Sequence, residues 1–300
     1  MTIIYSAPMA GVSDYPFRKI LRHFSDCPLF SEMISAETLM CQHPKTLKML
    51  TFQKEQNIIA QLVGANPSTM AQAAKHLEQL GVKEININMG CPVKKLIQNH
   101  SGAKLMQDYD LAQQIVSSVK NAVNAPVSVK TRLGWEHSDE IKIFAKILEN
   151  AGADSLIIHA RTKSQGYSGQ ANWEALGSLK IKIPYIVNGD IKDNQTKDLA
   201  LNQSHAIGIM VGRALLGKPW RLKEIETNKA IHVCMSDLIL EHLEEMLAYY
   251  GHHGLYVARK HLAWYATHKK GVAKWRQKMY LEENEVKLKK LIVDFWKGEA

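Results

Sequence analysis

Residues 83–92 read KEININMGCP, and this stretch decides the fold. Isoleucine alternates with asparagine, which is the period of a β-strand with one buried face. A glycine and a proline then end the strand, with Cys91 between them. Asn88, the thiol and the two lysines that follow stand at the carboxyl end of this strand, where they indicate a reaction site more than a core.

The composition is that of a protein with a large core. Of 300 residues, 46% are hydrophobic and 22% are charged, which suits one large α/β domain with a small appendage. The first residues, Met1–Tyr5, have no basic region and lead directly into strand-like sequence, so we expect no signal peptide. No apolar run is long enough to span a bilayer. We therefore expect a cytoplasmic protein with no membrane attachment.

The four cysteines are widely scattered and form no C-x-x-C pair. This spacing argues against a disulfide framework or a zinc site, and it fits a reducing cytosol. We expect no metal.

Short apolar strands alternate with amphipathic helices over the first two thirds of the chain. Eight strands are predicted, at Ile3–Pro8, Leu29–Met33, Ile58–Leu62, Lys83–Asn88, Val127–Arg132, Ser155–His159, Pro184–Asn188 and Ala206–Val211. Six helices are predicted between them, at Tyr15–Phe24, Pro67–Leu80, Asp110–Val123, Ser138–Asn150, Asn172–Leu179 and Asn194–Asn202. Eight βα units indicate an α/β protein whose parallel sheet closes into a (β/α)₈ TIM barrel. An open doubly wound sheet is the alternative, but the glycine-rich first turn typical of it is absent.

The pattern changes after the eighth strand. Four helices and no strand are predicted beyond residue 235, at Ser236–Tyr250, Leu255–His268, Val272–Tyr280 and Glu283–Trp296. We predict a catalytic barrel domain over residues 1–230 and an all-helical domain over residues 231–300.

Positive charge is concentrated in the helical region. The chain has a net charge of +9, and the segment from Arg259 to Lys278 holds seven Lys or Arg residues and no acid. A localised basic segment indicates a polyanionic partner, although a solvated helix face would also explain it.

Barrel enzymes carry their chemistry at the carboxyl ends of the strands. Polar or charged groups stand at most of the eight ends here. In chain order the strand ends hold Pro8, Met9 and Ala10; Glu32; Gln61; Asn88 with Cys91; Lys130 with Arg132; His159 with Arg161; Asn188, Gly189 and Asp190; and Gly212 with Arg213. One such residue would usually be a solvated cap, but the repetition indicates a site.

The last two strand ends suit a phosphate. Barrels frequently bind phosphate after strands seven and eight, where glycine lets backbone N–H groups approach the anion. Gly189 and Gly212 offer this approach, and Arg213 offers charge-assisted hydrogen bonds.

Three other strand-end residues suit a heterocycle. Gln61 can donate and accept, as the imide edge of a flavin or pyrimidine requires. Lys130 can place positive charge beside the N1/O2 region of a flavin, and His159 can bond a carbonyl or phosphate. A structural role in lining the barrel mouth is the alternative for each.

Cys91 lies on a loop framed by glycine and proline, directly after a strand. An ordinary thiol pKa of about 8.5 leaves it protonated near neutrality, so it can donate a proton. The nearby Lys94 and Lys95 would tend to lower that pKa. The residues leave open whether Cys91 is an acid or a nucleophile.

Motifs along most of the chain resemble those of the bacterial tRNA-dihydrouridine synthases, most closely the B-type group. The matching segments are residues 7–14 (APMAGVSD), 61–64 (QLVG), 88–95 (NMGCPVKK), 101–103 (SGA), 130–135 (KTRLGW), 159–162 (HART), 167–169 (YSG) with Trp173, 188–190 (NGD), 212–214 (GRA), 259–261 (RKH) and 264–265 (WY). Ser13, where threonine is common, and Asn99–His100, where a basic pair is more usual, depart from the family pattern.

The resemblance implies that FMN binds in the barrel mouth. The implied FMN-binding residues are Pro8, Met9, Ala10, Gln61, Lys130, His159, Asn188, Gly189, Asp190, Gly212 and Arg213. It implies that reduced FMN passes a hydride to C6 of a uridine in the D-loop of tRNA, that Cys91 gives a proton to C5, and that NADPH or NADH reduces the flavin.

The resemblance also implies a tRNA partner. Uridine must leave its stack to reach the flavin, so we expect an extensive contact surface between the protein and the RNA. The expected substrate and tRNA contacts are Asn88, Lys95, Arg132, Arg161, Arg259, Lys260, Lys269, Lys270, Lys274 and Arg276. Trp264, Tyr265 and Trp275 either stack on RNA or form the core of the helical domain. We expect a monomer.

Two other functions are weighed against this one. A flavin barrel that reduces a free small pyrimidine would share the cofactor but show no dependence on RNA. A non-catalytic RNA-binding protein on the same fold would bind no flavin. The basic helical appendage favours the tRNA enzyme.

Overall fold

The computed structural model describes residues 2–267 and 269–297. The chain folds into two compact units. The barrel unit contains the chain up to Asp14 together with Asp26–Gly212, and the helical unit contains Tyr15–Ser25 with the chain from Arg213 onward. The predicted boundary between residues 230 and 231 separates two domains that would each fold independently. Compact packing does not show independent folding, so this boundary stays a prediction.

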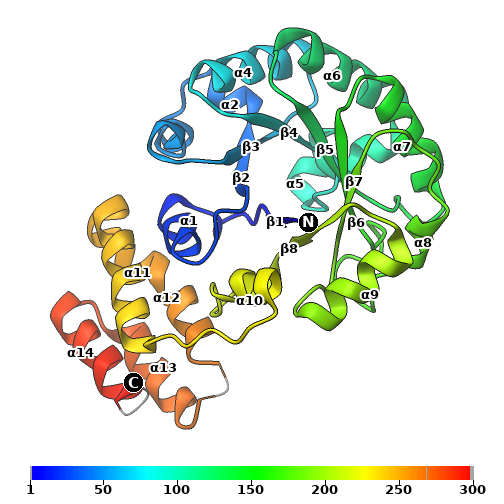
Figure 1. The fold of residues 1–300 in the computed structure, drawn as a ribbon. Helices are drawn as coiled ribbons and strands as arrows, with labels where there is room; N and C mark the ends of the chain where they lie inside the picture. Colours follow the sequence, from blue (N-terminus) through cyan, green and yellow to red (C-terminus); the bar gives the residue numbers. More distant parts are fainter. Residues whose placement is uncertain (1, 268, 298–300) are drawn as a thin grey trace. The chain divides into compact units, whose positions relative to one another are not determined.

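Eight parallel strands form one curled sheet in the barrel unit (Figure 1). The strands are β1 (Ile3–Ser6), β2 (Leu29–Ser35), β3 (Ile58–Val63), β4 (Glu84–Asn88), β5 (Val127–Arg132), β6 (Ser155–His159), β7 (Tyr185–Asn188) and β8 (Gly208–Val211). Their order in the sheet is β1-β8-β7-β6-β5-β4-β3-β2. Ser6 links the two edge strands, because its N–H donates to Pro28 O over 3.3 Å and its Oγ accepts from Phe30 N over 3.3 Å.

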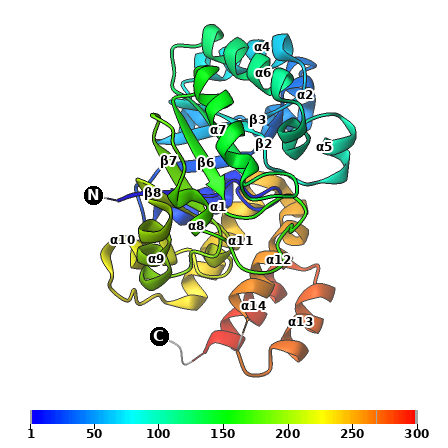
Figure 2. The same cartoon turned by 90° about the vertical axis from the view of Figure 1, so that its right-hand side faces the viewer.

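Helices follow most strands. Figure 1 shows α4, α6 and α7 outside the strands, and Figure 2 shows α4 and α6 beyond β3. The α-helices of the barrel unit are α2 (Ala36–Met40), α3 (Pro44–Lys48), α4 (Pro67–Gln79), α5 (Lys94–Gln98), α6 (Tyr109–Ala122), α7 (Glu140–Asn150), α8 (Glu174–Gly177) and α9 (Asn194–Ser204), with the 3₁₀ turns η1 (Phe52–Lys54) and η2 (Gly102–Gln107). The local sequence determines where α4 begins. Asn66 caps α4 by accepting from Thr69 N over 2.9 Å, with Pro67 at the first helical position.

The strand period divides the side chains of the sheet between two faces. Ile85 and Ile87 lie on one face of β4, and Glu84, Asn86 and Asn88 lie on the other. On that second face an apolar cluster fills much of the barrel interior. Its members are Ala7, Phe30, Ile59, Ile157, Ile186 and Met210. Polar side chains from β3, β4 and β5 occupy the remaining part of the interior.

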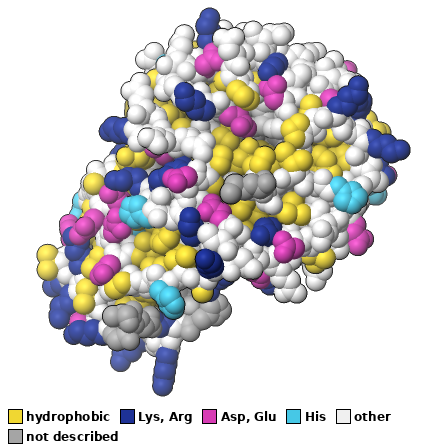
Figure 3. All heavy atoms as spheres, viewed as in Figure 1, with side chains coloured by type: hydrophobic (Ala, Val, Ile, Leu, Met, Phe, Trp, Pro, Cys, Tyr) yellow, Lys and Arg dark blue, Asp and Glu magenta, His cyan; other side chains and the backbone are white. Residues whose placement is uncertain are grey.

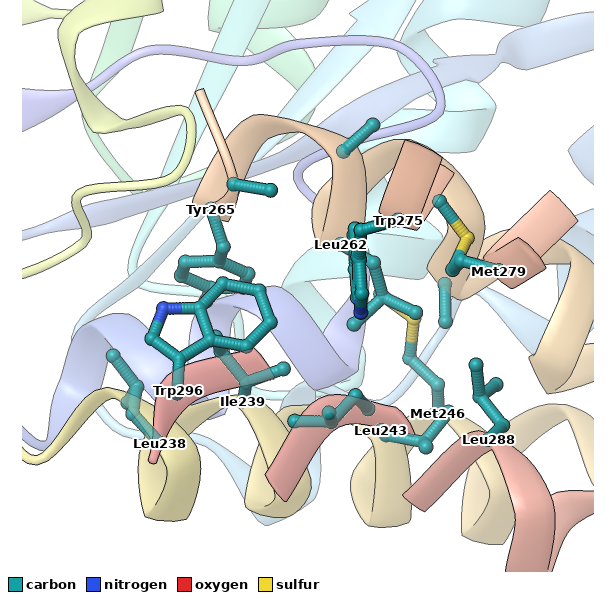
Figure 4. Close-up of a cluster of buried hydrophobic side chains, with 14 of the residues drawn as sticks. Leu238, Ile239, Leu243, Met246, Leu262, Tyr265, Trp275, Met279, Leu288 and Trp296 are labelled. Atoms are coloured by element: carbon teal, nitrogen blue, oxygen red, sulfur yellow. The ribbon is translucent and has the colours of Figure 1, made fainter. Parts of the chain in front are cut away.

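The helical unit is built around one hydrophobic core. Its helices are α1 (Tyr15–Arg22), α10 (Arg221–Thr227), α11 (Met235–Tyr250), α12 (Gly254–Tyr265), α13 (Val272–Leu281) and α14 (Glu285–Trp296), with the turns η3 (Arg213–Leu215) and η4 (Gly251–His253). Figure 4 shows Tyr265, Trp275 and Trp296 among Leu, Ile and Met side chains of this core. Tyr265 and Trp275 are therefore core residues, whereas Trp264 is half-buried.

The predicted (β/α)₈ barrel with a helical C-terminal region is confirmed, and the doubly wound alternative is excluded by the strand order. Both ends of each predicted strand lie within three residues of the ends of the matching observed strand. The short helices α2, α3, α5 and α10 were not predicted, because segments of five to seven residues carry too few turns to show a helical period. The predicted end of a helix at His268 lies outside the described residues.

Candidate functional site

Five polar side chains form a layer at the carboxyl ends of neighbouring strands. Gln61 comes from β3, Asn88 from β4, Lys130 from β5, His159 from β6 and Asn188 from β7. The sheet register places Asn88 beside Lys130 and His159 beside Asn188. The structure thus brings these five predicted residues into one layer of the barrel unit.

Amide side chains connect the β3 and β4 members of this layer. Asn88 Nδ2 donates to Gln61 Oε1 over 2.8 Å, and Gln61 Nε2 donates to Asn86 Oδ1 over 2.7 Å. Gln61 and Asn86 are fully buried, so water does not compete for these bonds. Asn88 and Gln61 are each held in one amide orientation.

The same asparagine holds the loop that carries Cys91. Asn88 Oδ1 accepts from the backbone N–H groups of Gly90 and Cys91, over 3.1 Å and 3.0 Å. Cys91 O accepts from Ala103 N over 3.0 Å, and a Cβ added at Gly102 would lie 2.8 Å from that oxygen. Gly102 also has a φ of +60°, which disfavours any other residue. The position of Cys91 is therefore fixed from both sides.

The thiol of Cys91 is half-buried, and burial raises its pKa. A hydrogen bond from Val93 N–H and the charges of Arg132 and Lys130 oppose this rise without cancelling it. The prediction that Lys94 and Lys95 lower this pKa was wrong, because both side chains are exposed on α5 and the cations that act on the thiol come from β5. The thiol is protonated at neutral pH.

The amine of Lys130 lies in a poorly solvated position. Its Nζ donates to Asn188 Oδ1 over 3.2 Å, and Asn188 in turn donates from Nδ2 to Met210 O over 2.8 Å. Burial, together with the charge of Arg132, lowers the pKa of Lys130 to about 7. Among the described residues Lys130 forms no ion pair, so an anion beside it would stabilise its charged form.

The two arginines of the site bind a loop of the chain itself. Arg132 donates from Nε to Gly90 O over 2.8 Å and from Nη1 to Gly166 O over 2.8 Å. Arg161, 1% exposed, donates from Nη2 to Gly169 O over 2.6 Å. Both side chains thus order residues 162–169. Tyr167 on this loop is 61% exposed, lies over the Arg132 guanidinium at 5.4 Å and is 6.1 Å from the His159 ring.

The segment after β7 is shaped by Asp190. Its Oδ2 accepts from Arg161 Nη2 over 2.5 Å and from Ala171 N over 2.9 Å. Gly189 has a φ of +117°, and a Cβ there would lie 3.2 Å from the His159 ring. The Asp190 carboxylate is neutralised by arginine, which removes much of its repulsion toward an anion near Gly189.

The loop after β1 is held by two side chains. Ser13 Oγ accepts from Met9 N over 2.9 Å and donates to Ala7 O over 3.0 Å. Glu32 Oε1 accepts from Gly11 N over 2.5 Å. The half-buried Pro8 and Met9 and the exposed Ala10 lie on this fixed loop. The hydroxyl of Ser13 therefore makes both of these hydrogen bonds at a position where the family pattern favours threonine.

Gly212 follows β8 as the last residue of the barrel unit, and the exposed Arg213 begins the helical unit at η3. Lys95 is exposed on α5.

The predicted basic residues of the helical unit have different environments. Arg259 Nη2 donates to Glu282 O over 3.3 Å, Arg276 Nη2 donates to Ala263 O over 2.6 Å, and Lys269 lies 5.2 Å from the Phe295 ring. Lys260 and Lys269 are half-buried, whereas Lys270 and Lys274 are exposed. Figure 3 shows Lys and Arg side chains along the outer edge of this unit.

Two interior residues of the network, Asn86 and Ser128, were missed in the sequence. Asn86 Nδ2 donates to Ser128 Oγ over 2.8 Å. The signal was present, because Glu84, Asn86 and Asn88 recur with the period of one strand face. Three polar residues on a buried face need partners, and these partners come from the neighbouring strands.

Within the described part of the chain, every helix is too short or too polar to cross a membrane. No group of three or more His, Cys, Asp or Glu side chains among the described residues is arranged to hold a metal ion.

Comparisons with solved structures support the fold. Histamine dehydrogenase from Rhizobium sp. 4-9 aligns with a TM-score of 0.59 and 14% identity over 81% of this chain and 48% of its own. An amine oxidase from Pseudomonas geniculata aligns with a TM-score of 0.57 and 13% identity over 79% of this chain and 50% of its own. The chain thus spans about half of each, and at this identity the likeness concerns the fold alone.

Sequence comparisons cover nearly the whole chain. A probable tRNA-dihydrouridine synthase of Rickettsia conorii is 37% identical over 98% of this chain and 93% of its own. The tRNA-dihydrouridine synthase B of Pasteurella multocida is 36% identical over 87% of this chain and 83% of its own, and that of Pseudomonas aeruginosa is 33% identical over 90% and 85%. The family profile for dihydrouridine synthase matches residues 5–297. The chain therefore belongs to the dihydrouridine synthase family of oxidoreductases, with B-type enzymes among its relatives.

Proposed function

We propose that this protein is a tRNA-dihydrouridine synthase that uses FMN and NADPH to reduce the C5=C6 bond of uridines in the D-loop of tRNA. The observation that carries the proposal is the layer of side chains at the strand ends. There the oriented amides of Gln61 and Asn88 lie with the buried Lys130, and Asn88 holds the loop that carries the protonated Cys91 thiol. The names of the relatives support the tRNA substrate.

The residues at the barrel mouth fit a flavin. Gln61 uses one N–H and one oxygen lone pair within the protein, so its amide retains one of each for an imide edge. Lys130 has a neutral amide as its hydrogen-bond partner and suits an anionic ring. Pro8, Met9, Ala10 and His159 would complete the ring site, and Asn188, Gly189, Asp190, Gly212 and Arg213 its phosphate end. FMN, when bound, would supply the hydride that adds to C6 of uracil, and NADPH would supply the electrons.

Cys91 would supply the proton. Hydride addition at C6 leaves an enolate that must be protonated at C5, and Cys91 Sγ gives up its proton to that carbon. The raised pKa favours the acid over the nucleophile, because the thiol is protonated at neutral pH. Arg132 and Lys130 would then stabilise the thiolate until solvent returns a proton.

The helical unit would bind the tRNA backbone. Lys270 and Lys274 are exposed and suited to phosphate contacts, with Lys95 on α5 and with Arg259, Lys260, Lys269 and Arg276 as further contributors. Arg132 and Arg161, which bind the 162–169 loop, would act on the uridine through that loop.

The double variant Lys270→Glu/Lys274→Glu tests the RNA surface. We expect tRNA binding to weaken by at least about tenfold and the slope of log affinity against log salt to fall by about 2, because two phosphate contacts are lost. Lys75→Glu/Lys142→Glu, which alters two exposed lysines of α4 and α7, makes the same change in net charge and is the control. Equal affinity of both variants would exclude this surface.

Substrate choice separates the proposal from reduction of a free pyrimidine. Purified enzyme with NADPH should form dihydrouridine in tRNA that lacks the modification and should leave UMP unchanged. Turnover should fall steeply with salt, because phosphate contacts supply the affinity. Reduction of UMP at the rate seen with tRNA would favour the small-molecule alternative.

A further inference from the structure

A hydrogen-bonded chain of side chains runs from the base of the barrel to the Cys91 loop. Ser128 Oγ donates to Glu84 Oε1 at the start of β4, and Asn86 Nδ2 donates to Ser128 Oγ over 2.8 Å. The chain continues from Asn86 through Gln61 to Asn88, over 2.7 Å and 2.8 Å, and ends at the N–H groups of Gly90 and Cys91. Glu84 and Asn88 are four residues apart on one strand, a separation of roughly 13 Å.

Every bond in this chain has the same direction. Each donor points toward Glu84 and each acceptor points toward the loop. Both ends demand this direction, because backbone N–H groups can only donate and the Glu84 carboxyl presents an acceptor oxygen to Ser128. If one side-chain amide were rotated by 180°, its N–H₂ group would face a neighbouring donor and its oxygen would face a neighbouring acceptor.

The interior side chains of this hydrogen-bonded chain take their orientation from their protein partners. Gln61, Asn86 and Ser128 are at most 1% exposed, so water cannot satisfy a reversed group. Chains of this kind also strengthen each bond by polarisation. The acceptor at the base and the backbone donors at the loop therefore together determine the orientation of Gln61 and Asn88.

We propose that Glu84 is a positioning residue for the reaction, which acts on the Cys91 loop and on the amide of Gln61 through Ser128 and Asn86. The role of Glu84 in catalysis rests on the proposed function. The effect of Glu84 on the Cys91 loop is independent of that function. The carboxyl offers the acceptor in both protonation states. Burial and the nearby Asp154 raise the pKa of Glu84, and the Ser128 hydroxyl opposes that rise.

The test compares two variants of the flavin-free protein by hydrogen exchange. Glu84→Met removes the acceptor at similar length, which lets Ser128 and the amides lose their common direction. We expect exchange of the Gly90 and Cys91 amides to accelerate about tenfold, the change expected for one lost hydrogen bond. Glu84→Gln keeps an acceptor oxygen and should restore wild-type protection at both amides. Strand β6 provides the internal reference, and its amides should keep their protection.

Unchanged exchange at Gly90 and Cys91 in Glu84→Met, or equal acceleration in Glu84→Gln, would overturn the proposal. Acceleration that includes β6 to the same extent would also overturn it, since it would show general destabilisation. In the holoenzyme, Glu84→Met should lower kcat with little change in KM for tRNA, and Glu84→Gln should restore kcat. A wild-type protein that reduces no uridine would remove the proposed function while leaving the exchange result intact.

Discussion

The amides inside the barrel unit and the histidine pair inside the helical unit are partnered differently. In the barrel unit each interior amide has partners on both sides, and the bonds lead to the Cys91 loop. In the helical unit His242 and His261 lie 4.7 Å apart between ring centroids, and their Nε2 atoms have no hydrogen-bond partner among the described residues. His242 Nδ1 bonds Tyr265 Oη over 2.9 Å, and Phe17 and Trp264 pack against the pair.

The contrast distinguishes the amides of the barrel, which orient a site, from the histidines of the helical unit, which pack in its core. A connected chain keeps its members in one orientation, as chemistry requires. Unpartnered imidazoles are tolerated only while they are neutral, because a buried charge without a partner is costly. The barrel network should therefore govern activity, and the histidine pair should govern acid stability.

The largest expected effect is that of Cys91→Ala on activity. Dihydrouridine formation should fall by about 10²- to 10⁴-fold, because a positioned general acid contributes that much. The unfolding free energy should change by less than about 1 kcal/mol, since the thiol is half-buried and is not part of the amide network. Quantification of dihydrouridine in tRNA and a urea titration measure the two quantities. Turnover at the wild-type rate would contradict the proton-donor role.

Asn86→Leu should break the barrel network at its centre. The change leaves Gln61 Nε2 without its acceptor and removes the donor to Ser128 Oγ, which keeps only its bond to Glu84. This should cost about 2 to 4 kcal/mol of stability. Denaturant unfolding measures the loss. The matched change in the helical unit is His261→Phe, and a similar loss in both variants would remove the contrast between the units.

Acidification should destabilise the helical unit. Burial lowers the pKa of His242 to about 3, and burial with the charges of His242 and Lys260 holds the pKa of His261 well below its usual value. The folded state therefore binds fewer protons than the unfolded state, whose histidines titrate near 6.5. Stability present above pH 6.5 should be lost as pH falls toward 3, by about 1.4 kcal/mol per pH unit for each histidine.

Hydrogen exchange between pH 7 and 5.5 measures this effect before most carboxylates titrate. After correction for intrinsic rates, amides of α11 and α12 should lose protection, while β4 and β5 keep theirs. Uniform loss in both units would argue against the histidine pair as the cause.

His261→Phe should have the smallest effect at neutral pH. An apolar ring of similar size replaces an imidazole whose Nε2 has no partner in the part of the chain that the structure describes. Stability at pH 7.5 should therefore stay within about 1 kcal/mol of wild type. The variant should also lose part of the acid sensitivity. His242→Phe is the comparison, and it should cost more because Tyr265 Oη loses its partner. A large loss in His261→Phe would show that the ring makes an essential contact.

The sequence predicts the architecture because the strands have a strong period. All eight strands and the four C-terminal helices were predicted, since alternation and helical spacing are local properties. The layer of Gln61, Asn88, Lys130, His159 and Asn188 also follows from the sequence, because parallel strands end at the same edge.

Other features depend on packing between segments. The direction of the Cys91 pKa shift depends on burial, and the sequence gives no measure of it. The bonds of Arg132 and Arg161 to residues 162–169 depend on the path of a loop. The role of Glu84 depends on the register of β3, β4 and β5, which joins side chains from three strands into one chain.

The visible absorption spectrum of the purified protein tests the central claim most directly. A flavin site at the barrel mouth predicts a yellow protein that holds about one FMN per chain and is bleached by NADPH. A colourless protein that also fails to take up added FMN would contradict the account.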